Sequence, residues 1–299
     1  MTITVLTAVT SKDKPYLKDC LQSLESSASI AGYLLNFIII ENGTRVPFPI
    51  YLHNPAKLIS VKTKIGFGES VNLAMSSVKN PWCLIVSPDV IIHKDCLKNI
   101  IPSQFDNKTA IIGPKVKLEN GKLQYTILPN LSVIQIFLEQ SYLYKLFPKI
   151  VKSPLSDSYL YKYVHQVDAI MAIFWMVNKD AFIRIGGFDE RFRFYFEDLD
   201  LCKRLKDNNC QIIFNPDAQV THLMHKSTGG ETDGRIYKES LRKYLYKYQN
   251  PLLAKISLFI FLAGSLVRLI YWKIILLVTS QSQIKSKARY KIRYFREII

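Results

Sequence analysis

The segment GGFDERFRFYFEDLDLC, residues Gly186–Cys202, is the stretch around which the rest of the chain is organised. Its aromatic residues lead directly into Glu197, Asp198 and Asp200, where a turn gives way to a predicted helix. Early acids and later Lys and Arg suit the dipole of a surface helix, which explains the charges but not the aromatic residues before them. Carboxylates beside aromatic rings form a partly desolvated pocket, which raises a carboxylate pKa and suits a general base. These residues alone leave both interpretations, a structural helix start and a general base, open.

Composition sets the class of the protein. The chain has 299 residues, of which 48% are hydrophobic and 12% aromatic, so it can build a sizeable core and is not a disordered chain. The net charge of +16 is uneven, because residues 231–299 carry 14 Lys and Arg against 4 Asp and Glu, or +10. A cationic tail favours an anionic partner, either membrane headgroups or nucleic acid.

The cysteines and the N-terminus both indicate a reducing compartment. Five cysteines are widely spaced and none forms a CxxC pair, which argues against a zinc site and for reduced, mostly structural thiols. The start of the chain, TITVLTAVT, has no basic segment followed by a long apolar core, so it is not a secretory signal. We therefore expect the N-terminal part to remain in the cytoplasm.

Strand and helix patterns alternate over the first 115 or so residues. Strands are predicted at 2–9, 34–40, 57–61 and 82–86, with helices at 14–29 and 69–78. This alternation predicts a mainly parallel sheet with helices on both faces, and ligands bind such sheets beyond the carboxyl ends of the strands. The segments expected to converge there are Thr7–Ser11, Glu41–Thr44, Lys64–Gly68 and Ser87–Asp89.

The next part of the chain is less regular. We expect a strand at 110–117, a hairpin turn at 119–122, an apolar helix at 131–147, and two strands at 211–214 and 218–222. Asp168 is the single acid in the apolar run Val164–Val177. Burying such an acid alone costs several kcal/mol, so it is expected to be paired or functional.

The C-terminal tail, residues 231–299, alternates basic and apolar stretches. Residues 237–248 are basic and rich in tyrosine, 252–278 are apolar, and 285–296 are basic again. The longest charge-free piece, 256–267, has 12 residues and is too short to span a bilayer. The pattern predicts anchoring at a membrane surface, with one tilted span as the alternative. Because the cations are interleaved with apolar runs, lipid is favoured over nucleic acid.

Six motifs in order carry a family resemblance: IIIENGT, KIGFGESVN, LIVSPDVII, VDAIMAIFWMV, GGFDERFRFYFEDLDLCKRLK and FNPDAQVTH. Together they resemble the inverting family-2 glycosyltransferases, and most closely the bacterial rhamnosyltransferase-like enzymes of O-antigen, capsule or cell-wall polysaccharide assembly. The resemblance covers about residues 2–230. It implies an α/β, Rossmann-like GT-A catalytic domain at 1–230, followed by a helical membrane-associating region at 231–299.

The resemblance also implies a binding site for a nucleotide-sugar donor. Its residues would be Thr7, Glu41, Gly66, Phe67, Gly68, Asn72, Ser87 and Asp89. Ser87-Pro88-Asp89 keeps only the last acid of the family's DxD-like motif. Asp89 and His222 would hold a divalent cation, Mg²⁺ or Mn²⁺, with phosphates supplying the other ligands. An ordinary strand-end histidine is the alternative for His222, and His225 is a nearby competitor.

For catalysis, the resemblance assigns the general base to Asp198, with Glu197 as the adjacent acid. Asp168, Tyr195 and Asp200 are assigned to the acceptor side. The base would take the proton from an acceptor hydroxyl that attacks the anomeric carbon opposite the nucleotide. Direct displacement of this kind inverts the anomeric centre through an oxocarbenium-like transition state.

The expected activity is transfer of a sugar, most simply L-rhamnose from dTDP-rhamnose, to a polyprenyl-diphosphate-linked glycan. The expected location is the cytoplasmic face of the plasma membrane, peripheral or monotopic, held by anionic lipid at the tail; a homo-oligomer is compatible with the resemblance. Alternatives within the fold are galactofuranosyl, glucosyl and N-acetylhexosaminyl transfer. From another class, the chain would be a basic nucleic-acid- or membrane-binding protein without catalysis, although no nucleic-acid partner is expected.

Overall fold

A computed structural model of the chain describes residues 2–43, 52–100, 106–141, 143, 153–154, 157–224 and 233–299. Within these residues the core is a nine-stranded sheet. Its strands run in the order β3 (Ala56–Val61), β2 (Leu34–Asn42), β1 (Thr2–Val9), β4 (Trp82–Val86), β10 (Phe174–Asn178), β6 (Thr109–Leu118), β11 (Gln211–His222) and β5 (Val90–Ile92), and β8 (His165–Gln166) also pairs with β11. A two-stranded sheet joins β7 (Ile127–Leu128) to β9 (Ala169–Ile170).

The sheet has a parallel half and a mixed half. The strands β3, β2, β1 and β4 are all parallel, whereas β10 lies antiparallel between β4 and β6. The strands of the parallel half are apolar on both faces: Ile3 and Val5 of β1 pack on one side and Leu6 on the other. Such two-faced burial is what a parallel sheet covered by helices requires. The expected α/β fold is confirmed.

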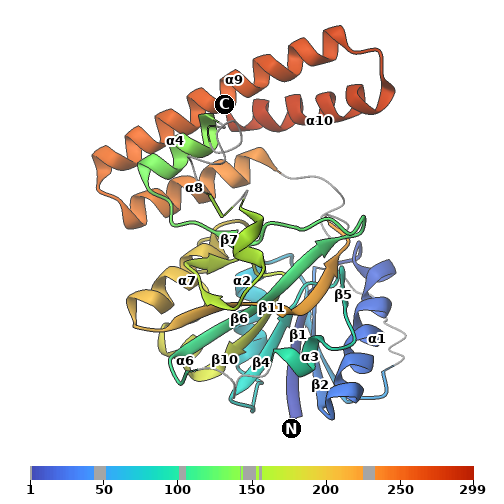
Figure 1. Cartoon of the computed structure of the whole chain (residues 1–299). Helices are drawn as coiled ribbons and strands as arrows, with labels where there is room; N and C mark the ends of the chain where they lie inside the picture. Colours follow the sequence, from blue (N-terminus) through green and yellow to red (C-terminus); the bar gives the residue numbers. More distant parts are fainter. Residues whose placement is uncertain are drawn as a thin grey trace.

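Helices cover both faces of the sheet (Figure 1). On one face lie α1 (Lys14–Ala31) and α3 (Cys96–Asn99), and on the other α2 (Phe67–Met75), α6 (Lys179–Arg184) and α7 (Glu197–Asp207). The first helix begins with proline in its first turn and ends at Gly32, whose φ of 71° lets its amide bond the carbonyls of the last turn.

Two expected elements differ from the structure. The strands predicted at 211–214 and 218–222 form one strand, β11, whose pairing with β6 shifts register between Asn215 and Gln219. The Asn215 side chain accepts a hydrogen bond from the Asp217 amide and donates one to the Asn99 carbonyl, so Asn-Pro-Asp makes a bulge and not a turn. The apolar run 164–177 divides into β8, β9 and β10. The predicted hairpin turn is confirmed by the Leu118–Lys122 hydrogen bond.

A helical layer lies beyond one end of the sheet (Figure 1). It contains α4 (Val133–Ser141), α8 (Gly234–Tyr248), α9 (Pro251–Val278) and α10 (Ser282–Ile298), with α9 packed on α4, α8 and α10. The carboxyl end of β1 points toward this layer. The remainder of the helix expected at 131–147 falls largely outside the described residues, as do Thr44, His225 and residues 231–232.

The helix α9 runs unbroken for 28 residues, well beyond the 12-residue charge-free piece considered from the sequence. By length and composition it is the one described helix that could cross a membrane. Only 28% of its most apolar window is buried, and Phe259, Val267, Leu277 and Val278 are among its strongly exposed side chains. An apolar surface of this kind is suited to contact with lipid.

Candidate active site

Two buried oxygens face the carboxyl ends of β1 and β2. Glu41 is 6% exposed; its Oε2 accepts a hydrogen bond from Ser60 Oγ at 2.6 Å, while Oε1 has no hydrogen-bond partner among the described residues. Thr7 Oγ1, on the neighbouring strand, is likewise buried without a partner in that part of the chain. Buried polar atoms are normally satisfied, so two such atoms at one sheet edge point to a polar ligand there.

Asp89 and His222 converge at the end of β4. The Asp89 carboxyl is fully buried and accepts a hydrogen bond from Ser87 Oγ at 2.7 Å, and His222 Nε2 lies 3.4 Å from Asp89 Oδ1. His222 Nδ1 lies 2.9 Å from Gln124 Oε1, an oxygen that can only accept, so Nδ1–H donates there and Nε2 is turned toward the carboxylate. An imidazole nitrogen and a carboxylate oxygen facing each other form a donor set that fits a shared cation.

The donor set at this position is small. Among the described residues no group of three or more His, Cys, Asp or Glu could hold a metal, so Asp89 and His222 would need oxygens from a bound ligand to complete the coordination. Mg²⁺ and Mn²⁺ are commonly held in this way, by one or two protein groups plus phosphate oxygens.

The turn Gly66–Gly68 contacts the segment that precedes α7. A Cβ on Gly66 would lie 2.9 Å from the Arg193 carbonyl oxygen, and one on Gly68 would lie 2.7 Å from Phe188 Cβ. Glycine therefore permits this close approach. The rings of Phe67 and Phe188 also meet edge to face. These residues are where donor contacts were expected, and they join two loops beside the carboxyl ends of the strands, the region that we call the strand-end crevice.

Asn72 and Asn42 hold this arrangement in place. The Asn72 amide accepts a hydrogen bond from Phe188 N and donates to Phe188 O, both at 2.9 Å, so it fixes the loop and does not point into open space. Asn42, which the sequence did not single out, makes the same two-way contact with Ile65, at 2.8 and 2.9 Å. Both amides tie a loop to the strand-end crevice.

The backbone turns sharply at the entrance to α7. Tyr195 and Phe196 have φ values of 67° and 68°, a left-handed conformation that costs a non-glycine residue about 1 kcal/mol or more. Both rings pack against Tyr237 of α8, at 5.2 and 5.1 Å between centroids, and Ser240 Oγ donates to the Phe194 carbonyl at 2.8 Å. Contacts from the helical layer thus stabilise a strained turn, and this turn positions the first residues of α7.

Glu197 and Asp198, the crevice pair, begin that helix. Burial raises the pKa of Glu197 well above its ordinary value, and the adjacent Asp198 charge adds to the rise. Burial also raises the pKa of Asp198, although its Oδ1 accepts a hydrogen bond from Leu199 N at 2.8 Å and its Oδ2 one from Ala172 N at 3.4 Å. Among the described residues no Lys, Arg or His forms an ion pair with either acid, which suits a group that must accept a proton.

One short segment links the crevice pair to Asp89 by direct contacts. Ala172 N donates to Asp198, and the next residue, Ile173, accepts a hydrogen bond from Ser87 N at 2.9 Å. Ser87 in turn donates to Asp89. Asp198 and Asp89 therefore lie on either side of the same two residues.

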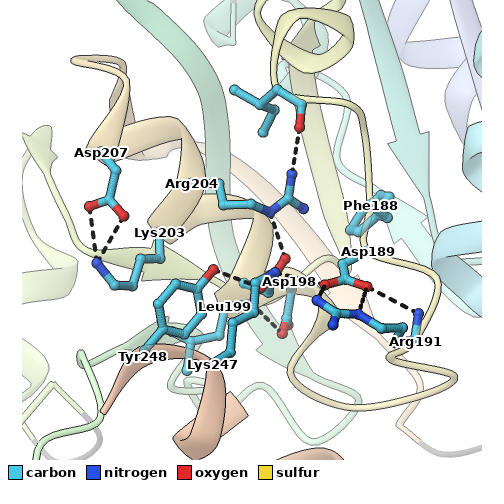
Figure 2. A network of polar contacts seen from close by, with 12 residues as sticks. Phe188, Asp189, Arg191, Asp198, Leu199, Lys203, Arg204, Asp207, Lys247 and Tyr248 are labelled. Atoms are coloured by element: carbon cyan, nitrogen blue, oxygen red, sulfur yellow. Dashed lines mark hydrogen bonds and ion pairs between the residues drawn. The ribbon is translucent and has the colours of Figure 1, made fainter. Parts of the chain in front are cut away.

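Asp200 occupies a different place from the expected acceptor side. Its carboxyl is fully buried, and it accepts hydrogen bonds from Arg204 Nε at 2.7 Å, Lys247 Nζ at 2.5 Å and Tyr248 Oη at 2.7 Å. These three donors are labelled in Figure 2. Lys247 also reaches Asp189 at 2.7 Å. These contacts bind α7 and the preceding loop to α8, so Asp200 is enclosed by protein and is not open to a substrate.

Asp168, assigned to the acceptor side from the sequence, lies at the surface beside Lys206. It is half exposed and pairs with Lys206, while the hydrogen bond from Ala172 N shows that the end of this segment lies beside Asp198. Lys206 is eight residues beyond Asp198, which is about 12 Å along a helix. Asp168 lies beside the last turn of α7, where the charge of Lys206 neutralises it at the surface.

Asp13 is a site residue that sequence reasoning missed. It is 2% exposed; its Oδ2 accepts hydrogen bonds from Thr10 N and Oγ1 at 2.5 and 2.8 Å, and its Oδ1 has no partner among the described residues. Burial is the main cause that raises its pKa to about 6, and the nearby charge of Asp89 contributes. In the sequence, its position before Lys14-Pro15 indicates a helix start and does not indicate a buried carboxyl near Asp89.

The five cysteines are free and buried, as expected for reduced structural thiols. Burial raises the pKa of Cys20, Cys83 and Cys96 to about 12, so none of these three is a reactive thiolate near neutral pH. The candidate chemistry therefore depends on the carboxylates and His222.

Comparisons with known proteins find relatives among glycosyltransferases. Residues 154–226 match a family model described as the N-terminal domain of galactosyltransferase, a range that includes β8–β11, α6 and α7. The chain is 20% identical over 258 residues to N-acetylglucosaminyl-diphospho-decaprenol L-rhamnosyltransferase from Mycobacterium tuberculosis, covering 80% of this chain and 82% of the relative.

Solved structures share the fold at low sequence identity. The mannosyltransferase PcManGT from Pyrobaculum calidifontis, in complex with GDP-Man and Mn²⁺, superposes with a TM-score of 0.57 at 10% identity, over 99% of this chain and 85% of that one. S. aureus TarS gives 0.53 at 14% identity over the whole of this chain, which spans 55% of the length of TarS. Both likenesses concern the fold.

Proposed function

We propose that this chain, which is a GT-A glycosyltransferase of the rhamnosyltransferase-like kind, transfers a sugar with inversion from a nucleotide sugar to a hydroxyl of a lipid-linked glycan. The observation that carries the proposal is the position of Asp198, a partly buried carboxylate with a raised pKa. Ala172 contacts this carboxylate, and the next residue, Ile173, contacts Ser87 at the strand-end crevice. A proton acceptor beside a polar crevice is the arrangement that sugar transfer requires.

In the reaction, Asp198 takes the proton of the acceptor hydroxyl while that oxygen attacks the anomeric carbon. The bond from that carbon to the nucleotide diphosphate breaks as the glycosidic bond forms, so no covalent intermediate with the protein is needed. Burial and the adjacent Asp198 charge both raise the pKa of Glu197, which favours its uncharged form beside an ionised base.

The donor would lie across the strand ends. Thr7 Oγ1 and Glu41 Oε1 offer a donor-acceptor hydroxyl and an acceptor oxygen for the nucleoside, which fits their lack of partners in the described chain. Asp89 and His222 fit a divalent cation, which when bound supplies positive charge against the leaving diphosphate. Gln124 keeps the His222 ring oriented for this contact.

The lipid-linked acceptor and the location follow from the tail and the relative. The exposed apolar side of α9 and the basic residues of α10 suit the surface of an anionic membrane. The relative from M. tuberculosis is named for a diphospho-decaprenol substrate and for L-rhamnose. We infer that the donor is dTDP-rhamnose, which supplies L-rhamnose. The enzyme would act at the cytoplasmic face of the membrane in surface polysaccharide assembly. Residues 1–230 would form the catalytic domain and residues 231–299 the membrane-associating region.

The test of the base is Asp198→Asn, with Asp207→Asn on the same helix as the matched control. Asp207 is exposed and pairs with Lys203, so its substitution leaves the crevice intact. Asp198→Asn is expected to lower transfer by about 10²–10⁴-fold, the usual contribution of a general base, while nucleotide-sugar binding by calorimetry is retained. Undiminished turnover by Asp198→Asn would exclude this residue as the base.

The donor is tested with a panel of nucleotide sugars, including dTDP-rhamnose and the UDP-activated forms of glucose, galactofuranose and N-acetylglucosamine. Release of nucleotide diphosphate, dependent on a lipid-linked acceptor, is the measurement. A clear preference for dTDP-rhamnose supports the proposal. A preference for another sugar retains the glycosyltransferase and replaces the donor.

A further inference from the structure

We propose that a cationic groove between α8, α9 and α10, the tail groove, binds the diphosphate of an isoprenoid diphosphate carrier to which the acceptor glycan is attached. This inference rests on the proposed function and deepens it, because it locates the acceptor's headgroup on the chain. The groove is about 920 Å³ in volume and is formed by the start of α8, the end of α9 and the last two-thirds of α10.

The lining of the tail groove is strongly positive. Its cations come from three helices and are Arg235, Lys273, Arg289, Arg293 and Arg296. Glu297 also lines the groove, but its Oε2 already accepts a hydrogen bond from Gly234 N at 2.9 Å. Arg235 Nε also lies 3.8 Å from Asp233 Oδ1, so five cations against Glu297 and Asp233 leave a charge of +3, which complements a diphosphate. One guanidinium group can donate two parallel hydrogen bonds to the oxygens of a phosphate. Four arginines therefore suit a ligand with two phosphates better than a ligand with a single carboxylate.

The same groove has an apolar side. Leu276, Leu277 and Ile292 line it together with the cations. Leu277 is 84% exposed and Val278, the next residue, is 73% exposed, so apolar surface continues from the groove along the end of α9. A ligand with a charged head and a hydrocarbon chain would match both parts, whereas a free anion would match only the first.

The tail groove is next to the elements that position the proposed base. Arg235 is two residues before Tyr237, and the Tyr237 ring contacts those of Tyr195 and Phe196, which lead directly into Glu197 and Asp198. The first turn of α8 therefore lines the groove through Arg235 and contacts, through Tyr237, the turn that leads into Asp198.

This proximity favours the acceptor's carrier over ordinary bilayer phospholipid. Attraction to a flat anionic surface needs only cations spread over the exposed side of the tail, as Lys255 is. It does not need five cations from three helices gathered around one concavity beside the active site. We therefore commit to the isoprenoid diphosphate as the occupant, and phospholipid binding becomes an outcome of the test.

The experiment compares two double charge reversals in the full chain. Lys273→Glu with Arg289→Glu changes the groove, and Lys255→Glu with Lys285→Glu makes the same change of charge on the same two helices outside its lining. Binding is measured to phosphatidylcholine vesicles that contain either a polyprenyl diphosphate or phosphatidylglycerol at equal charge. Thermal unfolding checks that each variant is folded, and the milder Lys273→Gln with Arg289→Gln replaces the first pair if it is not.

The groove variant is expected to lose about tenfold or more in affinity for the polyprenyl diphosphate vesicles, and the control variant much less. On phosphatidylglycerol the two should lose similar, smaller amounts. Equal losses of the two variants on the diphosphate lipid, or an equally selective loss on phosphatidylglycerol, would overturn the inference. If the groove variant alone loses diphosphate binding but the wild-type chain transfers no sugar to any such lipid, the groove stands and the proposed function fails.

Discussion

Two pairs of acids in one short segment have opposite electrostatic environments. In the crevice pair, Glu197 is buried and Asp198 is partly buried, and this burial raises the pKa of both. The second pair, Asp189 and Asp200, which we call the clamp pair, shares the ammonium group of Lys247 (Figure 2). The hydrogen bond from Arg191 is the main cause that lowers the pKa of Asp189 far below its ordinary value.

The difference lies in the partners and not in the acids themselves. Asp198 and Asp200 are two residues apart on one helix, so they project from different sides of it. One side faces Ala172 and the crevice, and the other faces α8, which supplies Lys247 and Tyr248. A paired acid holds the structure together, whereas an acid without a cation keeps a proton affinity that chemistry can use.

The largest expected effect is on stability, from Asp200→Asn. Removing this carboxylate leaves the Arg204 and Lys247 charges without their buried partner, which typically costs about 3–5 kcal/mol. The lower end is expected here, because Lys247 retains Asp189. Asp198→Asn removes a charge that burial disfavours, so it should leave the free energy of unfolding unchanged or raise it. Urea denaturation of the two variants measures the contrast, and equal destabilisation would contradict it.

The second expected effect is an opposite dependence of stability on pH. The folded pKa values of the crevice pair lie above their unfolded values, so the stability that this pair contributes is present at low pH and is lost as pH rises above about 4–4.5. The folded pKa of Asp189 lies below its unfolded value of 3.8, so its contribution is present above that pH and is lost as pH falls.

Urea denaturation between pH 3 and 8 tests this contrast. Relative to the wild type, Glu197→Gln with Asp198→Asn should gain stability as pH rises, by up to about 1.4 kcal/mol per pH unit for each proton involved. Asp189→Asn should lose stability relative to the wild type over the same rise. If the free energy of unfolding of both variants, relative to the wild type, changed with pH in the same direction, the two pairs would not have opposite pKa shifts. The rate of transfer should also fall as pH drops through the raised pKa of Asp198, because a protonated base is inactive.

Much of the fold could be predicted from the sequence, because it depends on local pattern. The bounds of β1 and β4 coincide with the expected 2–9 and 82–86, since each strand is a short apolar run bounded by turn signals. The order of strands and helices likewise predicted where the strand ends would converge. The single strand β11 was wrongly divided because Asn-Pro-Asp signals a turn locally, whereas pairing with β6 continues through it.

The partners of the acids could not be predicted, because they are distant in sequence. Lys247 and Tyr248 are 47 and 48 residues from Asp200, and nothing in the EDLD motif distinguishes an acid that will meet them from one that will not. Asp168 was expected to be paired or functional, and only the structure shows that its partner is Lys206. Pattern locates a cluster of acids, and tertiary packing divides it into structural and reactive members.

The smallest effect separates one hydrogen bond of the clamp pair from the packing around it. Tyr248 Oη donates to Asp200 at 2.7 Å, and Tyr244, one turn earlier on α8, is a buried tyrosine whose Oη has no partner among the described residues. Tyr248→Phe should lower the free energy of unfolding by about 1.5 kcal/mol, the lower range for a hydrogen bond to a charged group. Tyr244→Phe removes the same atom without a bond, so it should be neutral or slightly stabilising. Urea denaturation of both variants gives the difference directly. If the two substitutions have equal effects, Tyr248 contributes packing alone, and the hold on Asp200 comes from Arg204 and Lys247.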